Sequence, residues 1–311
     1  MTHTRTMAFN PETTMLAAGM IQQGQVVDVP TETVYGLAGD ARNADAVAAI
    51  YAAKGRPDFN PLIVHVANIE MARQLAHFTE LAERLAAQFW PGALTMVLPL
   101  REDAGLAPAV YAGLPTVALR MPAHAAMQAL IHESGAPLAA PSANASGGIS
   151  PTSAAHVLRS LGGRIPLVID GGTTAKGLES TIIAPETDRI RLLRPGPVTA
   201  EMLDLASGLP VTGSDGGIIE APGQLASHYA PGKPLRLNAT SARTDEYLIG
   251  FGAMACDTNL SETGNLEQAA SRLFAALHMA DMSTQARIAV APVPQEGIGI
   301  AINDRLTRAA A

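Results

Sequence analysis

Short runs of β-branched and aliphatic residues alternate with stretches of helical periodicity along most of this chain, and this alternation constrains the fold most strongly. Residues 25–30 (QVVDVP) and 61–66 (PLIVHV) have the composition of strands. Between them, residues 43–54 place Val47, Ile50 and Tyr51 on one face of a helix. Strands interleaved with helices in this way predict an α/β fold, with a twisted sheet covered by helices.

The same alternation continues to about residue 207. A second helix is predicted at residues 79–89, where Leu81, Leu85 and Phe89 recur every four residues before Pro91 and Gly92. Further strands are predicted at residues 94–100, 116–120, 138–140, 167–169, 181–184 and 190–193. We therefore predict one large α/β domain over residues 1–209.

The composition changes after Leu209. Residues 210–233 are rich in glycine, serine and proline without helical periodicity, which predicts a linker. Residues 234–311 repeat the α/β pattern on a smaller scale, with strands predicted at 247–251 and 288–292. Between these strands, an apolar helical stripe runs through Leu266, Ala270, Leu273, Phe274 and Leu277. This region is expected to form a small C-terminal α/β domain.

Composition excludes several classes of protein. With 48% hydrophobic and 16% charged residues, the chain is not expected to be disordered. One cysteine, Cys256, excludes a disulfide framework and a cysteine-based metal site, and a reducing, cytoplasmic compartment is expected. The sequence contains no run of 18 apolar residues, so no membrane span is predicted. The N-terminus lacks the hydrophobic run of a secretory signal. A net charge of -7 disfavours general nucleic-acid binding.

Polar clusters lie at the ends of the predicted strands, where open α/β sheets bind ligands. They are PTETVYGL (30–37), KGRP (54–57), NP before the strand with His65, PSANASG (141–147), EST (179–181) and RPG (194–196). Together they contribute the cations Lys54, Arg56, Arg120 and Arg194, with hydroxyls and amides around them. Such a set suits a polyphosphate or carboxylate, because arginine and lysine neutralise anionic oxygens.

Each cluster also has a purely structural interpretation. Lys54 and Arg56 could be solvated cations at a helix C-terminus, and His65 could be a hydrogen-bonded core histidine. The hydroxyls and amides, Thr31, Thr33, Ser142 and Asn144, could simply form turns. The repetition of such groups at strand ends favours a site over these separate explanations.

On these motifs, together with STII (180–183) and LRPGPV (193–198), residues 8–207 resemble the YrdC-like family of threonylcarbamoyl-AMP synthases. SHYAP (227–231) and DRLTRAA (304–310) resemble its two-domain, Sua-type branch. The resemblance implies a YrdC-like twisted open sheet with helices, followed by a smaller Rossmann-like C-terminal domain.

The resemblance also implies a reaction. ATP, L-threonine and bicarbonate or CO2 would give threonylcarbamoyl-AMP and pyrophosphate, with Mg²⁺ carried by the ATP phosphates. Downstream transferase proteins would move the threonylcarbamoyl group to tRNA, which makes tRNA an indirect partner and leaves direct binding open.

Carried over to matching positions, the family's site implies two groups of residues. Lys54 and Arg56 would be catalytic and bind ATP. The other ATP contacts would be Asn60, Thr116, Ser142, Asn144, Ser150, Arg194 and Tyr229. The L-threonine contacts would be Thr33, His65, Arg120, Ser180 and the backbone of Ala140.

The predicted linker has two interpretations. In the Sua-type branch, a linker of this kind folds over the nucleotide as a lid, and Tyr229 would close on ATP. Alternatively, the linker is a passive tether, with Tyr229 packed between the domains.

Two other functions are compatible with a YrdC-like domain. One is a non-enzymatic RNA-binding module, against which the net charge, three lysines and 4% aromatic residues argue. The other is carbamoyl transfer during hydrogenase maturation, whose larger proteins carry zinc-finger-like segments that one cysteine excludes.

Overall fold

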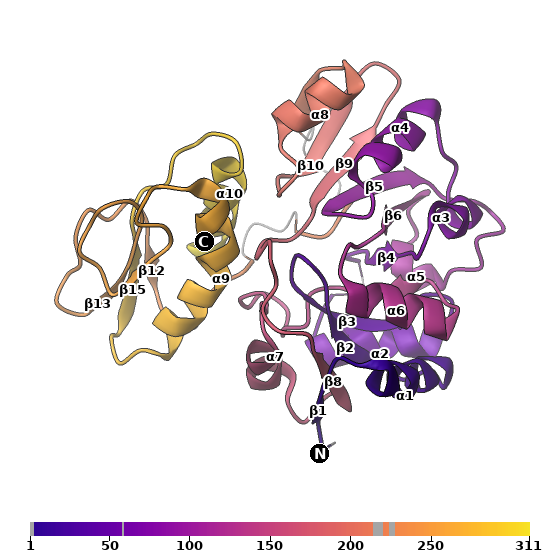
Figure 1. Ribbon diagram of the computed structural model, residues 1–311, viewed down its shortest axis with the longest axis horizontal. Helices are drawn as coiled ribbons and strands as arrows, with labels where there is room; N and C mark the ends of the chain where they lie inside the picture. The colour runs from indigo at the N-terminus through magenta and orange to yellow at the C-terminus, as the bar shows by residue number, and fades with distance from the viewer. Residues whose placement is uncertain (1–2, 58, 214–219, 224–227) are drawn as a thin grey trace.

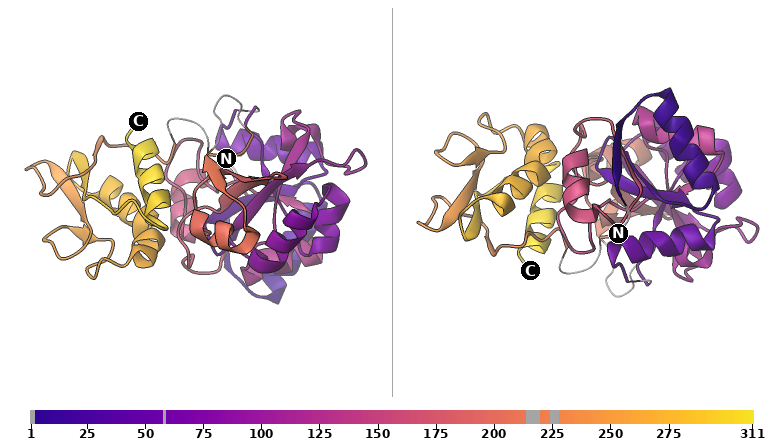
Figure 2. Two further views of the ribbon diagram at one scale, coloured as in Figure 1. Left: turned by 90° about the horizontal axis from the view of Figure 1, so that it is seen from above. Right: turned by 90° about the horizontal axis from the view of Figure 1, so that it is seen from below.

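A computed structural model describes residues 3–57, 59–213, 220–223 and 228–311. Over these residues the chain forms two sheets, one large and one small, each packed against helices (Figures 1 and 2). The large sheet has the strand order β1-β8-β2-β3-β7-β4-β6-β5-β9-β10-β11. Its strands are β1 (Arg5–Ala8), β2 (Val27–Pro30), β3 (Tyr35–Asp40), β4 (Ile63–His65), β5 (Leu94–Pro99), β6 (Thr116–Arg120), β7 (Leu138–Ala139), β8 (Leu167–Asp170), β9 (Thr181–Pro185), β10 (Ile190–Arg194) and β11 (Val211–Gly213).

Helices cover both faces of this sheet. They are α1 (Pro11–Gln22), α2 (Ala44–Lys54), α3 (Ile69–Leu75), α4 (Glu80–Phe89), α5 (Pro108–Tyr111), α6 (Ala125–Ser134), α7 (Ala154–Leu161) and α8 (Ala200–Ser207). Successive residues of β3 show the two faces, because Leu37 packs in a cluster with α2 and α4, whereas Ala38 packs in another with α1 and α6. The α/β fold with a large mixed sheet is therefore confirmed.

The predicted helices form because local signals agree with the apolar pattern. The Asn43 side chain caps α2 by accepting from the backbone N–H of Asp45 and Ala46, and Gly55 ends the helix in the left-handed conformation. Thr79 caps α4 in the same way. The strands predicted between residues 25 and 193 are also confirmed, each to within a few residues.

Three strands of the large sheet were not predicted, namely β1 at its edge, β3 and β11. Residues 35–40 form β3, the antiparallel partner of β2, so PTETVYGL is a turn followed by a strand rather than a polar loop. The Thr31 hydroxyl builds that turn, because it accepts from the N–H of Thr33 and of Val34. The predicted linker 210–233 contains β11, which pairs in parallel with β10 and extends the large sheet to Gly213.

The small sheet is parallel throughout and has the order β12-β15-β13-β14. Its elements are β12 (Leu235–Arg236), β13 (Glu246–Gly250), β14 (Thr258–Asn259), β15 (Arg287–Val290), α9 (Leu266–Met282) and α10 (Gly299–Ala309). Helices α9 and α10 lie between this sheet and the rest of the molecule (Figure 1). The predicted stripe of α9 is core, and its cluster includes Val34, Ile149 and Leu178 from the part of the chain that forms the large sheet.

The chain before β12 packs on the loop that follows β7 and on α10. Ala230 bridges to Gly148 and donates its N–H to the carbonyl of Gly147 at 2.8 Å, while the N–H of His228 donates to the carbonyl of Arg308 in α10. Ser227 of the SHYAP motif and residues 214–219 lie outside the described residues. No helix within the described ranges is long and apolar enough to cross a membrane.

Candidate active site

A cleft containing about 560 Å³ of empty space lies where several strand ends of the large sheet meet the segment before β12. Nine of the fourteen predicted site residues line it: Thr33, Arg56, His65, Arg120, Ala140, Ser142, Ser180, Arg194 and Tyr229. Its other described lining residues include Glu179, Gly223 and His228. The site therefore combines groups that lie more than 190 positions apart in the sequence.

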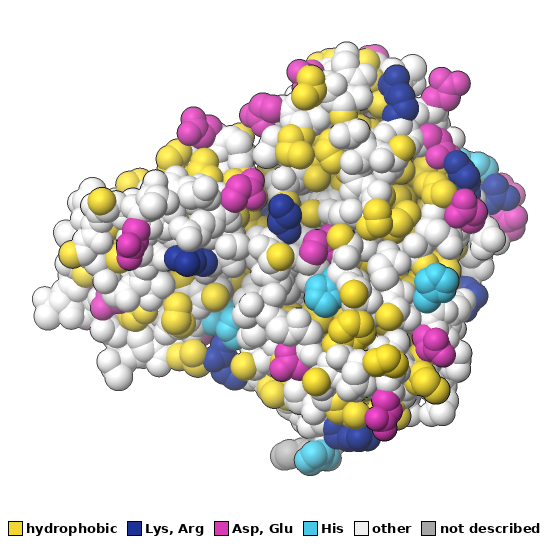
Figure 3. All heavy atoms as spheres, in the orientation of Figure 1, with side chains coloured by type: hydrophobic (Ala, Val, Ile, Leu, Met, Phe, Trp, Pro, Cys, Tyr) yellow, Lys and Arg dark blue, Asp and Glu magenta, His cyan; other side chains and the backbone are white. Residues whose placement is uncertain are grey.

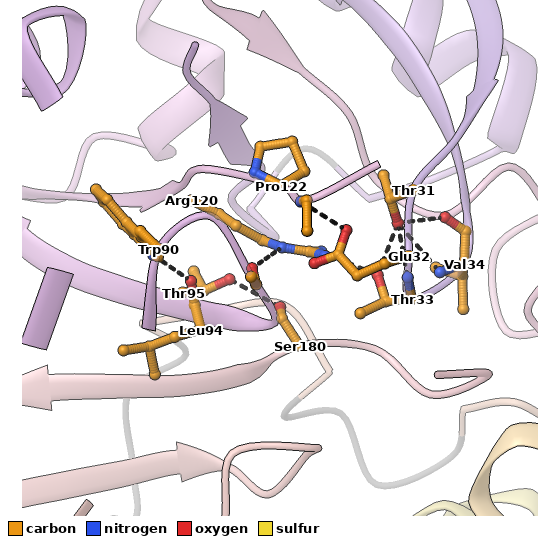
Figure 4. Close-up of polar contacts among 12 residues, drawn as sticks. Thr31, Glu32, Thr33, Val34, Trp90, Leu94, Thr95, Arg120, Pro122 and Ser180 are labelled. Carbon is orange, nitrogen blue, oxygen red and sulfur yellow. Dashed lines mark hydrogen bonds and ion pairs between the residues drawn. The ribbon is translucent and has the colours of Figure 1, made fainter. Parts of the chain in front are cut away.

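The strand order brings Arg120, His65 and Thr33 together. Strand β4 pairs in parallel with β6, so that His65 lies directly beside Arg120. The Arg120 guanidinium donates to the Thr33 hydroxyl at 3.0 Å and to the carbonyl of Gly92 at 3.1 Å (Figure 4). It also donates to the Glu32 carboxylate at 2.5 Å. Arg120 is thus buried and held from three sides, with its charge directed at the cleft.

His65 is a buried, neutral imidazole. Burial, together with the neighbouring charge of Arg120, lowers the pKa of His65 to about 3. Its Nδ1 has no hydrogen-bond partner among the described residues, although the ring lines the cleft. A buried, unpaired polar atom of this kind is available to a ligand hydroxyl or amine. At Ala140 the backbone N–H already donates to the carbonyl of Ile63 at 3.1 Å.

Ser180 belongs to a chain of buried polar groups. Its hydroxyl lies 2.7 Å from the Thr95 hydroxyl and accepts from Arg194 Nη2 at 3.1 Å (Figure 4 shows the contact with Thr95). Arg194 also donates twice to the Ser180 carbonyl. Thr95 was not predicted as a site residue, and it orients the Ser180 hydroxyl.

Lys54 lies at the C-terminus of α2, behind the loop 141–147. Its ammonium donates to the backbone carbonyl of Ser142 and, at 2.6 Å, to that of Asn144. Burial and the charge of Arg56 lower the pKa of Lys54 below its usual range. The side chain does not itself contribute to the described cleft lining, so it acts on the cleft through its charge and through Ser142.

Arg56 does line the cleft. It donates to the carbonyl of Asn60 at 3.2 Å and to that of Pro61 at 2.9 Å, which fixes its guanidinium against the start of β4. Burial lowers the pKa of Arg56 to about 10, so it remains charged at neutral pH. The Asn60 amide is fully buried, and neither of its polar atoms has a partner among the described residues.

Three further predicted ATP contacts lie away from the described lining. Thr116 begins β6, at the opposite end of the strand from Arg120, and Asn144 donates to the carbonyls of Ala145 and Gly148. The Ser150 hydroxyl donates to the Glu179 carboxylate. Their contact with ATP stays a prediction.

Tyr229 faces the cleft on one side and packs against α9 on the other. Its hydroxyl has no partner within the described ranges, and the residue lines the cleft. Its ring packs on Phe274 of α9, with centroids 5.6 Å apart. Gly223 lies against both Tyr229 and Arg194: with φ +87°, an added Cβ would come within 2.9 Å of each. The segment before β12 therefore forms one wall of the cleft.

The carboxylates Glu32 and Glu179 and the cation Arg305 are functional candidates that sequence reasoning did not assign. Both glutamates lie inside quoted motifs, and a search for counter-ions to the clustered arginines could have found them. Arg305 lies in DRLTRAA, but nothing local in the sequence predicts its contact with Glu179, 126 positions away.

Comparison with known proteins agrees with this architecture. A family model for Sua5, YciO and YrdC proteins, described as "Telomere recombination", matches residues 19–196. A second, described as "Threonylcarbamoyl-AMP synthase, C-terminal domain", matches residues 198–311.

Two curated relatives are similar over nearly their whole length. A threonylcarbamoyl-AMP synthase of Bacillus subtilis is 42% identical, over 94% of this chain and 92% of its own. One of Pyrococcus abyssi is 40% identical, over 94% and 93%. The crystal structure of P. abyssi Sua5 complexed with L-threonine superposes with a TM-score of 0.89 at 37% identity, covering 100% of this chain and 97% of that one.

Proposed function

The chain belongs to the Sua5/YrdC family of threonylcarbamoyl-AMP synthases, and on this premise we propose that its cleft joins L-threonine, ATP and bicarbonate or CO2 into threonylcarbamoyl-AMP, releasing pyrophosphate. The observation that carries the proposal is the composition of one cleft. Carboxylate-binding and hydroxyl-binding groups around Arg120 meet the buried Arg194 and the half-buried Arg56 beneath Tyr229. An amino acid and a nucleotide can therefore be held side by side.

Arg120 would bind the threonine carboxylate. A guanidinium has five N–H donors, and three of those of Arg120 donate to described protein groups, which leaves two for a carboxylate. The neutral His65 ring and the hydroxyls of Thr33 and Ser180 would bind the threonine hydroxyl and amine. A buried site built to hydrogen-bond a hydroxyl rejects analogues that lack it.

The chemistry would proceed in two steps. The threonine amine forms a bond to the carbon of CO2 and loses a proton, which gives a carbamate. A carbamate oxygen then attacks the α-phosphorus of ATP, and the bond from that phosphorus to the bridging oxygen of pyrophosphate breaks. The carbamate is already anionic, so the second step needs positioning and charge neutralisation rather than a strong base.

Lys54, Arg56 and Arg194 would supply that neutralisation. Lys54 and Arg194 are buried and Arg56 is half-buried. Backbone carbonyls hold all three, so little reorganisation is needed when the phosphates arrive. Anionic phosphate would also raise the pKa of Lys54 again, which favours its charged form in the complex.

Mg²⁺ is expected to enter with ATP. The described residues contain no group of three or more histidine, cysteine or acidic side chains placed to bind a metal ion, and Glu179 at the cleft is engaged by Arg305. This donor set fits an ion held by the nucleotide phosphates, where it would neutralise phosphate charge.

The segment with Tyr229 would act as a lid over the product. An acyl adenylate hydrolyses readily, and a wall that closes over it excludes water. Gly223 fits this role because it lets the chain pass against Arg194 without a side chain in between.

The product would be used by transferase proteins that act on tRNA, with this chain working as a cytoplasmic nucleotidyltransferase. No observation favours the non-enzymatic RNA-binding alternative. Of the cleft cations, Arg120 and Arg194 are buried and Arg56 is half-buried, and Figure 3 shows both signs of charge scattered over the face it draws. An RNA-binding surface needs exposed cations and stacking groups.

Pyrophosphate release tests the proposal directly. Purified protein with ATP and Mg²⁺ should release pyrophosphate only when L-threonine and bicarbonate are both present, and serine should support much slower release. Release that ignores threonine, or no release with all three substrates, would contradict the proposed function.

A further inference from the structure

Arg305 of α10 is completely buried, although it lies in the helix that packs beside the small sheet. Its guanidinium donates to the Glu179 carboxylate at 2.9 Å and to the Pro195 carbonyl at 3.0 Å, both in the part of the chain that forms the large sheet. Burying an arginine requires charge and hydrogen-bond partners. One partner of Arg305, Asp304, precedes it in α10 and accepts at 2.6 Å. The other two are Glu179, which lines the cleft, and Pro195, which follows the cleft residue Arg194.

Glu179 extends this contact into the cleft. Its second carboxylate oxygen accepts from the Ser150 hydroxyl, and the residue lines the cleft beside Ser180. Burial alone would raise the pKa of Glu179, but Arg305 and Arg194 hold it below its usual range. The carboxylate therefore stays ionised and needs a fixed cation on its far side.

Arg305 also touches the wall of the cleft. Its guanidinium carbon lies 5.1 Å from the centroid of the Tyr229 ring, within cation–π range. Pro195, whose carbonyl it binds, directly follows Arg194. One side chain thus contacts the segment that carries Arg194, the partner of Ser150 and the ring of Tyr229.

A buried ion pair adds little net stability compared with an apolar pair of similar volume. Such a pair instead fixes the positions of the groups around it. Around Arg305 these groups are three predicted ATP contacts, namely Ser150, Arg194 and Tyr229. We propose that Arg305 is a positioning residue for the ATP subsite, acting through Glu179, Pro195 and Tyr229 without contacting the nucleotide. The proposal rests on the proposed function and adds a residue of the C-terminal half to its machinery.

Steady-state kinetics of Arg305→Lys test the proposal. Lysine keeps the charge but lacks the planar guanidinium with its five N–H donors. It therefore cannot contact Glu179, Pro195 and Tyr229 at the same time. We expect the KM for ATP to rise roughly tenfold, as for a lost charge-assisted hydrogen bond, while the KM for threonine changes little. Arg236→Lys is the matched control, because Arg236 pairs with Glu246 in the small sheet and is not part of the described cleft lining.

Misfolding would reduce the active fraction without raising the KM for ATP, so the two explanations are distinguishable. An unchanged KM for ATP, or equal rises for ATP and threonine, would overturn the proposal. If wild-type protein releases no threonine-dependent pyrophosphate, the proposed function fails before Arg305 is tested.

A double-mutant cycle provides a second measurement. If Arg305 holds Tyr229 in place, Tyr229→Phe should raise the KM for ATP less in the Arg305→Lys background than in the wild type. Strictly additive effects would overturn the proposal, because they would mean that the two residues act independently. Thermal melts of all four proteins establish that each is folded.

Discussion

Arg120 Nη2 and Glu32 Oε1 lie 2.5 Å apart, in an ion pair whose side chains are 4% and 12% exposed. Glu32 comes from the turn between β2 and β3, whereas Arg120 ends β6, so the pair connects two distant strands of the large sheet (Figure 4). The other Glu32 oxygen accepts from the N–H of Ala123 at 3.1 Å. The residue expected to bind threonine is therefore itself held by a protein carboxylate.

Glu32→Ala should weaken threonine binding. Without the carboxylate, Arg120 loses one anchor and Ala123 loses its acceptor, so we expect the KM for threonine to rise about tenfold with little change for ATP. Glu32→Gln keeps an acceptor oxygen and should have a smaller effect. Equal threonine KM values for wild type and Glu32→Ala would show that the pair does not position Arg120.

Lys54→Ala and Arg56→Ala should each lower turnover by about a hundredfold or more, because each removes a preorganised charge beside the phosphates. Initial rates of pyrophosphate release at saturating substrates measure the effect. Lys176→Ala is the control, since Lys176 is exposed and outside the described cleft lining. Near-normal turnover in either variant, with the protein folded by circular dichroism, would remove that residue from the mechanism.

Gly177→Ala should destabilise the protein by disrupting the packing of the Gly177 loop on α9. An added Cβ would come within 2.4 Å of the Ser271 backbone in α9, and Gly177 has φ +67°. Gly172→Ala is the matched control, because Gly172 has φ +83° but nothing within 4 Å of an added Cβ. We expect about 1–2 kcal/mol of destabilisation in both from the left-handed backbone. The clash should add about 1–3 kcal/mol in Gly177→Ala alone. Equal melting temperatures would argue against close packing of this loop on α9.

Because of Asp28, the free energy of unfolding should fall as pH rises. It is fully buried in β2, and neither carboxylate oxygen makes a well-formed hydrogen bond with a described residue. Burial raises the pKa of Asp28 well above its usual value of 3.8. The folded state thus keeps a proton that the unfolded state releases, and the associated stability is lost as pH rises from about 3.8 through the folded-state pKa.

Asp28→Val should therefore raise the melting temperature, and by more at pH 8 than at pH 5. Valine suits this position because its neighbours Val27 and Val29 are also buried strand residues. Thermal melts of both proteins at the two pH values measure the difference. A stabilisation that does not depend on pH would mean that Asp28 is already ionised at pH 5 in the folded protein, as it is in the unfolded chain.

The sequence predicted the elements whose signals are local. Residues 43–54 carry both an apolar face and the capping residues Asn43 and Gly55, and the helix forms there. Strand β3 lacked such a signal, because its sequence YGLAGD contains two glycines and is buried on both faces up to its last residue, so no alternation appears. Strand β11 has three residues, too few for a pattern, and forms because β10 offers an edge.

The site was predictable as a set of motifs but not as a geometry. Strand-end clusters predicted that Thr33, His65 and Arg120 would meet, and the parallel pairing of β4 with β6 places the last two side by side. The contact of Arg305 with Glu179 depends on how α10 packs against the large sheet, a long-range property without a local pattern. The Thr31 turn, by contrast, was one of the interpretations that the sequence offered, because threonine hydroxyls often hydrogen-bond nearby backbone groups in turns.

Identification of the product tests the central claim most directly. The protein would be incubated with ATP, Mg²⁺, L-threonine and ¹³C-bicarbonate, and the mixture analysed at once by mass spectrometry. We predict threonylcarbamoyl-AMP that carries the ¹³C label, and none when threonine is omitted. ATP conversion without this labelled adenylate, under conditions in which the protein is folded, would contradict the assignment.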